Sequence, residues 1–291
     1  MPQISPVERQ LLKNFIARNT AVAPVDLDEG IGTVYERRLI DAYLLRLMRQ
    51  YGLQSILETP ADGVTGVPGI NSLEFARHGA HVTLANPVPA MLEKAATVWT
   101  RQGLRDQAEF HHAEADSLPF QDNAFDLVWN FCMFERFDPP DIVLSEMARV
   151  AKGYVMVMNQ NYRNWGTPVH KLYHNLANLE WDHGYVPLMS SEAIVESMGR
   201  VGLKVLEVGY IDTPPWMDTW DMPLRGALKG VLGKLGMTWE WKSNQKPIDE
   251  NKASGTGQET MLNLFEWVEH NLPAWFARSQ THHYYVLGQK I

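Results

Sequence analysis

Apolar and polar positions follow two alternating periodicities through the middle of the chain. Short apolar runs bounded by turn residues predict strands, at 55–58, 81–85, 109–113, 125–131, 154–158 and 203–211. Segments with apolar residues at helical spacing lie between them, at 70–77, 88–100, 140–150 and after Ser190 or Ser191. Strands that alternate with helices predict an α/β fold with helices on both faces of a mostly parallel sheet. Ligands of such sheets bind beyond the carboxyl ends of the strands.

Segments outside this alternation predict additional parts. A capping box at Ser5 begins one helix and a second runs from 33 to 51, which gives an N-terminal helical cap over 1–52. The core then covers 53–211 and 281–291. Two stretches, 160–189 and 212–280, are too long for simple connections and are interpreted as insertions that form a lid or contact substrate.

The second insertion is rich in tryptophan. It carries six of the ten tryptophans of the chain, which are Trp216, Trp220, Trp239, Trp241, Trp267 and Trp275. Such large apolar side chains are expected to be buried. The segment 224–237 is basic, amphipathic and rich in glycine, which fits a lid segment or a membrane-surface helix.

Composition narrows the possible partners and compartments. Among 291 residues 45% are apolar, which is enough for a large core, and the net charge of −8 argues against nucleic acid as the main partner. The single cysteine, Cys132, excludes an internal disulfide and fits a reducing compartment. No signal pattern and no apolar run of about 18 residues is present, so we expect a cytoplasmic protein without stable membrane insertion.

The stretch from Glu114 to Met158 carries the most specific motifs. It reads Glu-Ala-Asp-Ser-Leu-Pro-Phe, then Phe-Asp-Leu-Val, then Glu-Met-Ala-Arg-Val-Ala-Lys-Gly before another buried strand. In these motifs and their spacing the chain resembles the class I S-adenosylmethionine (SAM)-dependent methyltransferases. The resemblance implies SAM as cofactor and a Rossmann-like sheet of seven strands. It also implies a final antiparallel hairpin, which here carries the aromatic-rich insertion.

The resemblance places one part of the cofactor site directly after the first strand. Glu58 matches the acid of the family at that point. Pro60 and Asp62 stand where the family has its first two glycines, and the segment is about five residues longer than usual. Gly63, Gly66 and Gly69 are expected to build a longer cradle, because glycine lets the backbone approach a ligand closely. The alternative is a turn that binds nothing.

Further cofactor contacts are implied at the next two strands. Asn86 occupies the position of the acid that binds ribose, with Pro87 and Met91 after it. An amide can accept and donate hydrogen bonds but lacks the charge of a carboxylate. Asn86 and Pro87 also fit an ordinary helix N-cap and first helical residue.

An acid follows the strand at 109–113. Glu114, followed by Ala115, matches the acid that binds adenine, and Asp116 competes for this role. A carboxylate can accept a hydrogen bond from the adenine amino group. The alternative is a solvated carboxylate in a loop.

Two more pairs complete the candidate cofactor residues. Asn130 and Phe131 end the strand at 125–131 and can line the methyl-transfer site, although a buried turn amide fits Asn130 equally well. Tyr35 and Arg37 stand where related enzymes cover the SAM carboxylate with an aromatic or basic residue. The alternative for this pair is an exposed first turn of a helix.

Histidines supply the candidate catalytic bases. His170 and His174 lie four residues apart, which places both on one helix face. The glutamate of a His-Glu-x-x-His zinc motif is absent, so we expect a polar face of the cap or a general base rather than a metal site. The pairs His111–His112 and His282–His283 lie in strands and are interpreted as structural.

Together these features predict SAM-dependent methyl transfer to a small or medium-sized, partly apolar organic acceptor. A hydroxyl acceptor would need a base such as His170 or His174. A catalytically inactive methyltransferase-like binding or scaffold module is the alternative, favoured by Pro60 and Asn86. A nicotinamide-dependent oxidoreductase fits less well, because Gly-x-Gly-x-x-Gly is absent after the first strand.

Overall fold

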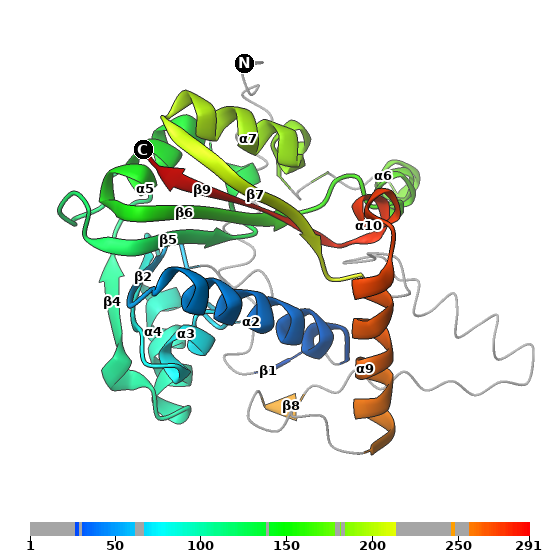
Figure 1. Cartoon of the computed structure of the whole chain (residues 1–291), viewed down its shortest axis with the longest axis horizontal. Coiled ribbons are helices and arrows are strands. Elements are labelled where there is room, and N and C mark those ends of the chain that lie inside the picture. Colours follow the sequence, from blue (N-terminus) through cyan, green and yellow to red (C-terminus); the bar gives the residue numbers. More distant parts are fainter. Residues whose placement is uncertain are drawn as a thin grey trace, which may run out of the picture.

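A seven-stranded mixed sheet forms the centre of the molecule (Figure 1). The computed structural model describes residues 27–28, 31–61, 67–137, 140–177, 181, 184–213, 246–247 and 256–291. The order of the sheet is β4-β3-β2-β5-β6-β9-β7, and only β9 runs antiparallel to its neighbours. The strands are β2 (Ser55–Glu58), β3 (His81–Asn86), β4 (Ala108–His112), β5 (Phe125–Phe131), β6 (Ala151–Gln160), β7 (Leu203–Ile211) and β9 (His283–Lys290). This order confirms the predicted Rossmann-like methyltransferase fold.

Helices cover both faces of the sheet because successive strand residues point to opposite sides. Ile56 packs with the first face, which is covered by α2 (Ile31–Tyr51), α3 (Leu73–Arg77) and α4 (Pro89–Arg101). Leu57, the next residue, packs with the second face, which is covered by α5 (Pro140–Val150) and α7 (Ser191–Arg200). None of the helices in the described ranges is long and apolar enough to cross a membrane.

The helix after β3 begins later than the sequence predicts. The expectation that Asn86 and Pro87 form its N-cap and first residue is wrong, because α4 begins at Pro89 with Val88 as N-cap. The Asn86 side chain instead accepts a hydrogen bond from the Val88 backbone N–H at 2.7 Å, which closes a turn ahead of the helix.

The predicted antiparallel hairpin is confirmed, since β7 and β9 pair antiparallel around a large insertion. The insertion contains α9 (Thr256–Asn271) and α10 (Ala274–Gln280), and β8 (Lys246–Pro247) pairs with β1 (Leu27–Asp28). Burial of the insertion tryptophans was expected. That expectation is wrong for Trp267 and Trp275, which are 63% and 74% exposed. The other four tryptophans, the helix after Ser5 and the segment 224–237 lie outside the described residues.

Polar contacts and a buried leucine attach α9 to α2. The Tyr35 hydroxyl donates a hydrogen bond to Glu269 Oε2 at 2.6 Å, and the Arg38 guanidinium pairs with Glu259 at 2.7 Å and Glu266 at 2.9 Å. Leu262 of α9 is fully buried in the core beneath. The helix therefore lies beside the N-terminal end of α2, next to the turn that follows β7 (Figure 1).

Candidate functional site

Three neighbouring strands end in buried polar residues at the carboxyl edge of the sheet. Glu58 ends β2 and Asn86 ends β3, while Asn130 is the penultimate residue of β5. The Glu58 carboxylate accepts a hydrogen bond from the Ser72 hydroxyl at 2.5 Å. Ser72 in turn accepts one from the Trp129 indole N–H at 3.0 Å, so the carboxylate is fixed in orientation.

The two amides tie the bend after β2 to its neighbours. Asn86 Nδ2 donates to the carbonyl oxygen of Ala61 at 2.7 Å, and Asn130 Nδ2 donates to that of Thr59 at 3.1 Å. The bond between Thr59 and Pro60 is cis. Residues 62–66, with Gly63 and Gly66, lie outside the described residues. The amides therefore order the start of the bend.

An exposed carboxylate follows β4, the strand that neighbours β3 at the edge of the sheet. Glu114 and Asp116 are exposed, and Ala115 between them is buried. The Glu114 carboxylate has no hydrogen-bond or ion-pair partner among the described residues, so its oxygens are available to a donor. Met91 is buried in α4, and Pro87, directly after β3, is half-buried.

The polar groups at these tips fit the chemistry of SAM. A cationic sulfonium and an ammonium group favour nearby carboxylates, and adenine and ribose need hydrogen-bond acceptors. Glu58 and Glu114 supply carboxylates on either side of Asn86, and the Glu114 oxygens lack a described partner. Asn86 uses one amide proton and one lone pair within the protein, which leaves one of each.

The candidates near the N-terminus occupy different environments. Tyr35 is fully buried, so the alternative of an exposed first turn is wrong for this residue. Its hydroxyl is engaged by Glu269, and its ring packs edge-on against Phe265 with centroids 5.7 Å apart. Arg37 is half-buried, close to Glu36 and Asp41. A contact of Tyr35 or Arg37 with SAM stays a prediction.

The two candidate base histidines face one another. His170 and His174 lie on α6 (Gly166–Ala177), and their Nε2 atoms are 3.2 Å apart. Both are buried, and the Trp181 ring lies against both rings with centroids 5.5 and 5.4 Å away. The two histidines are thus enclosed rather than exposed, and their role as a polar face of the cap or as a base stays a prediction.

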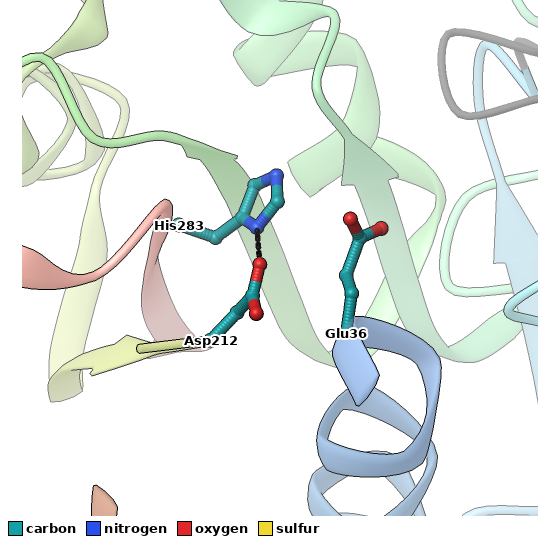
Figure 2. Close-up of side chains that lie close together, drawn as sticks. All are labelled: Glu36, Asp212 and His283. Carbon is teal, nitrogen blue, oxygen red and sulfur yellow. Dashed lines mark ion pairs between the residues drawn. The ribbon is translucent and has the colours of Figure 1, made fainter. Parts of the chain in front are cut away.

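A buried cluster that the sequence did not reveal lies at the same edge of the sheet (Figure 2). It joins Glu36 of α2, Asp212 directly after β7 and His283 at the start of β9. Nδ1 of His283 lies 3.4 Å from Oδ2 of Asp212, and Nδ1 of His282 lies equally close to that oxygen. The Phe131 ring packs on the His283 ring with centroids 5.3 Å apart.

Burial and charge set the protonation of this cluster. Burial raises the pKa of Glu36 to about 7. Burial also opposes ionisation of Asp212, but the neighbouring His282 and His283 hold the pKa of that carboxyl below its usual range. Burial would lower the pKa of His283, yet the neighbouring Cys132, Asp212 and Glu36 raise it well above its usual value. Asp212 and His283 therefore favour opposite charges, and burial opposes ionisation of the neighbouring Glu36 carboxyl.

The cluster escaped sequence analysis because its members are far apart in the chain. His283 belongs to a pair interpreted as structural, and Glu36 and Asp212 lie in no recognisable motif. One signal was available: Asp212 and His283 stand at the ends of the predicted hairpin strands, at the edge where ligands bind. To predict the cluster from this signal, one would also have to know that β7 pairs with β9 and where α2 lies.

Comparisons with known proteins agree with this fold. Residues 64–157 match the methyltransferase domain family. A probable chloroplastic tocopherol O-methyltransferase of Oryza sativa subsp. japonica is 26% identical over 186 residues, which are 60% of this chain and 50% of that protein. The ubiquinone/menaquinone biosynthesis C-methyltransferase UbiE of Brucella canis is 34% identical over 90 residues, 31% of this chain and 34% of that one. The chain thus spans half or less of the length of these relatives.

Solved structures match over more of the chain. Geranyl diphosphate C-methyltransferase from Streptomyces coelicolor A3(2) has a TM-score of 0.53 at 14% identity, covering 99% of this chain and 100% of that one. Magnesium protoporphyrin IX methyltransferase from Synechocystis PCC 6803 has a TM-score of 0.52 at 15% identity, covering 70% and 90%. At such identities these matches show the fold. The family match at residues 64–157 assigns a SAM-dependent methyltransferase domain to that part of the chain, and SAM is the cofactor of this class.

Proposed function

We propose that the chain transfers a methyl group from SAM to a small or medium-sized, partly apolar organic acceptor. The observation that carries this proposal is the row of Glu58, Asn86 and Glu114 at the tips of adjacent strands within a methyltransferase domain. These groups match the hydrogen-bonding needs of SAM, and they lie at the edge where such sheets bind ligands.

Each residue has a proposed role toward the cofactor. Glu58 and the bend that holds Pro60, Gly63 and Gly66 bind the amino-acid part, and Asn86 with Pro87 contacts the ribose. Glu114 accepts a hydrogen bond from the adenine amino group, with Asp116 as the competing acceptor, and Ala115 and Met91 provide apolar contacts to the ring. Asn130 and Phe131 line the transfer site, and Tyr35 and Arg37 cover the carboxylate. When bound, SAM supplies an electrophilic methyl group, and the protein positions and desolvates the acceptor.

The two insertions support an enclosed acceptor site. Asn161 Nδ2 donates to the carbonyl oxygen of Thr281 at 3.0 Å, and Asn164 Nδ2 donates to that of Gln280 at 2.7 Å. These bonds join the start of the 160–189 insertion to the end of α10. The connection lies at the tip of β6, next to the edge of the sheet where the polar row lies, as a lid requires.

A hydroxyl acceptor must lose a proton during transfer. We propose the pair of His170 and His174 for this step, because the 3.2 Å separation lets one ring donate its Nε2 proton to the other. A proton taken up by one imidazole is then shared with its neighbour.

The class of substrate and the cellular compartment are part of the same proposal. The names of the relatives refer to tocopherol, ubiquinone and menaquinone, which supports a small molecule rather than a nucleic acid as partner. The net charge of −8 agrees with this choice. The only cysteine, Cys132, is fully buried and free, which is compatible with the cytoplasm that we propose as the compartment.

The alternative is a methyltransferase-like module that has lost catalysis. It is favoured by Asn86, whose amide holds Ala61 and Val88 in place of a carboxylate directed at ribose. Incubation with methyl-labelled SAM and small-molecule extracts of the source cells, read by mass spectrometry, separates the two. Labelled product together with S-adenosylhomocysteine supports the enzyme. Binding of SAM without any labelled product supports the inactive module.

A further inference from the structure

We propose that Glu36, Asp212 and His283 bind one divalent metal ion at the carboxyl edge of the sheet. This site goes beyond the proposed methyl transfer, and its three residues are not among those proposed to contact SAM. Three chain segments supply the ligands: the first turns of α2, the residue after β7 and the first residue of β9. Figure 2 shows the three side chains converging on the same space.

The distances between the ligand atoms suit an ion. One donor atom from each residue lies within 4.8 Å of the other two, and His283 Nδ1 lies 3.4 Å from Asp212 Oδ2. An ion about 2.1 Å from each donor separates them by about 3.0 Å when they are adjacent and about 4.2 Å when they are opposite. The existing spacing is therefore close to that of a bound state, and rotation of the Glu36 side chain closes the remainder.

One of the ligand atoms lacks the partner that a buried polar group normally has. The His283 ring is 5% exposed, yet its Nδ1 makes no hydrogen bond, because its approach to Asp212 falls outside hydrogen-bond geometry. The Glu36 carboxylate has no hydrogen bond or ion pair with any described residue. Buried polar groups are nearly always satisfied, so each unsatisfied group needs an explanation. A cation would give His283 Nδ1 a partner, and its charge would also suit the half-buried Glu36 carboxylate.

The surroundings hold the ligands in place. The Glu269 carboxylate accepts hydrogen bonds from the backbone N–H groups of Asp212 and Thr213 at 2.9 and 2.8 Å, which fixes Asp212 at a φ of 70°. The Cys132 thiol lies beside the His283 ring. Such outer contacts orient the ligands of metal sites.

The donor set indicates the class of ion. Two carboxylate oxygens and one imidazole nitrogen suit Mn²⁺, Fe²⁺ or Zn²⁺ better than a soft ion, which prefers sulfur. Three protein ligands leave coordination positions free for water or for an oxygen atom of a bound small molecule. The cluster therefore has the composition of a reactive metal site rather than a closed structural one.

The test uses the full chain, stripped with a chelator and then titrated with Mn²⁺ while the electron paramagnetic resonance signal of the free ion is followed. We expect one ion to bind per chain. Glu36→Gln and Asp212→Asn should each weaken binding at least tenfold. Glu36→Gln is the safer variant for folding, because it removes charge from a side chain without a described partner. Circular dichroism and thermal unfolding report whether each variant folds.

A matched control is available on the surface. Glu109 lies within 3.4 Å of His81 and 3.0 Å of His111, but its side chain is 58% exposed. Glu109→Gln should leave the affinity for Mn²⁺ unchanged. The proposal is overturned if no saturable binding occurs below about 1 mM, if Glu36→Gln leaves the affinity intact, or if Glu109→Gln abolishes it. Since the readout needs neither SAM nor turnover, its failure leaves the proposed methyl transfer untouched.

Discussion

Tyr35 and Glu269 connect the N-terminal cap to the insertion in the final hairpin through a hydrogen bond of 2.6 Å. The same Glu269 carboxylate accepts hydrogen bonds from the backbone N–H groups of Asp212 and Thr213. One side chain of α9 thereby fixes both the start of α2 and the turn after β7. These two segments provide two of the three residues in the buried cluster, so the insertion takes part in shaping that region.

Removing the Tyr35 hydroxyl tests the importance of its hydrogen bond to Glu269. Tyr35→Phe should lower the free energy of unfolding by about 1 kcal/mol, because Glu269 loses its donor while the ring contacts remain. Urea unfolding followed by fluorescence measures the change. Tyr162→Phe is the control, since the Tyr162 hydroxyl is a partner of Lys171 in a more exposed setting and should matter less. Equal effects of both substitutions would contradict the role assigned to Tyr35.

The row of Glu58, Asn86 and Glu114 at the strand tips gives a second prediction. Glu114→Ala and Glu58→Ala should each weaken SAM binding at least tenfold, on the order of 1.4 kcal/mol, because each removes a proposed acceptor. Glu114 is exposed, so its replacement should leave thermal unfolding unchanged, whereas Glu58 also holds Ser72. Equilibrium dialysis with labelled SAM gives the affinities. Unchanged affinity in both variants would show that the cofactor lies elsewhere.

Asp126 makes stability depend on pH. Partial burial opposes its ionisation, but backbone N–H groups of Gln54 and Ser55 and the charge of Lys152 lower its pKa. A carboxylate with a lowered pKa stabilises the fold above the unfolded value of about 3.9, and this contribution is lost as pH falls through the folded pKa. Asp126→Asn should therefore destabilise the protein at pH 7 and flatten the loss of stability below about pH 4.

Unfolding in urea at a series of pH values measures this effect. Asp106→Asn, at an exposed carboxylate, is the control and should leave the dependence of unfolding free energy on pH unchanged. An Asp126→Asn profile parallel to that of the wild type would mean that the two backbone hydrogen bonds do not depend on the charge.

Gly69 should be hard to replace. It has a φ of 69°, and a Cβ atom there would collide with the Leu84 side chain of β3. Gly79 has a φ of 91° with nothing within 4 Å of the added atom. Gly79→Ala should cost about 1 kcal/mol through backbone strain alone, and Gly69→Ala should cost more by the energy of the clash. Thermal unfolding of both variants makes the comparison, and equal costs would show that Leu84 moves aside freely.

Most of the sheet could be predicted from sequence because periodicity is a local property. The strand at 125–131 and the helix at 140–150 were predicted with the bounds that the structure has. Ser190 caps α7, as its hydroxyl accepts a hydrogen bond from the Ala193 N–H. The hairpin of β7 and β9 followed from the resemblance rather than from any local pattern.

Features that depend on distant segments were missed. The burial of Tyr35 results from α9, which follows it by more than two hundred residues in sequence, so no local pattern indicates it. The exposure of Trp267 and Trp275 likewise depends on which side of α9 and α10 meets the core. The convergence of Asp212 and His283 required the register of β9 between β6 and β7, which pairs His283 with Ile211. These are tertiary relationships, and periodicity does not contain them.

The proposed methyl transfer requires that a sulfonium nucleoside be held where β2, β3 and β4 end. Isothermal titration calorimetry of the full chain with SAM, repeated with S-adenosylhomocysteine, addresses this most directly. We expect each ligand to bind once per chain and to compete with the other. The absence of saturable heat for both ligands at millimolar concentration, with a protein that unfolds cooperatively, would contradict the assignment.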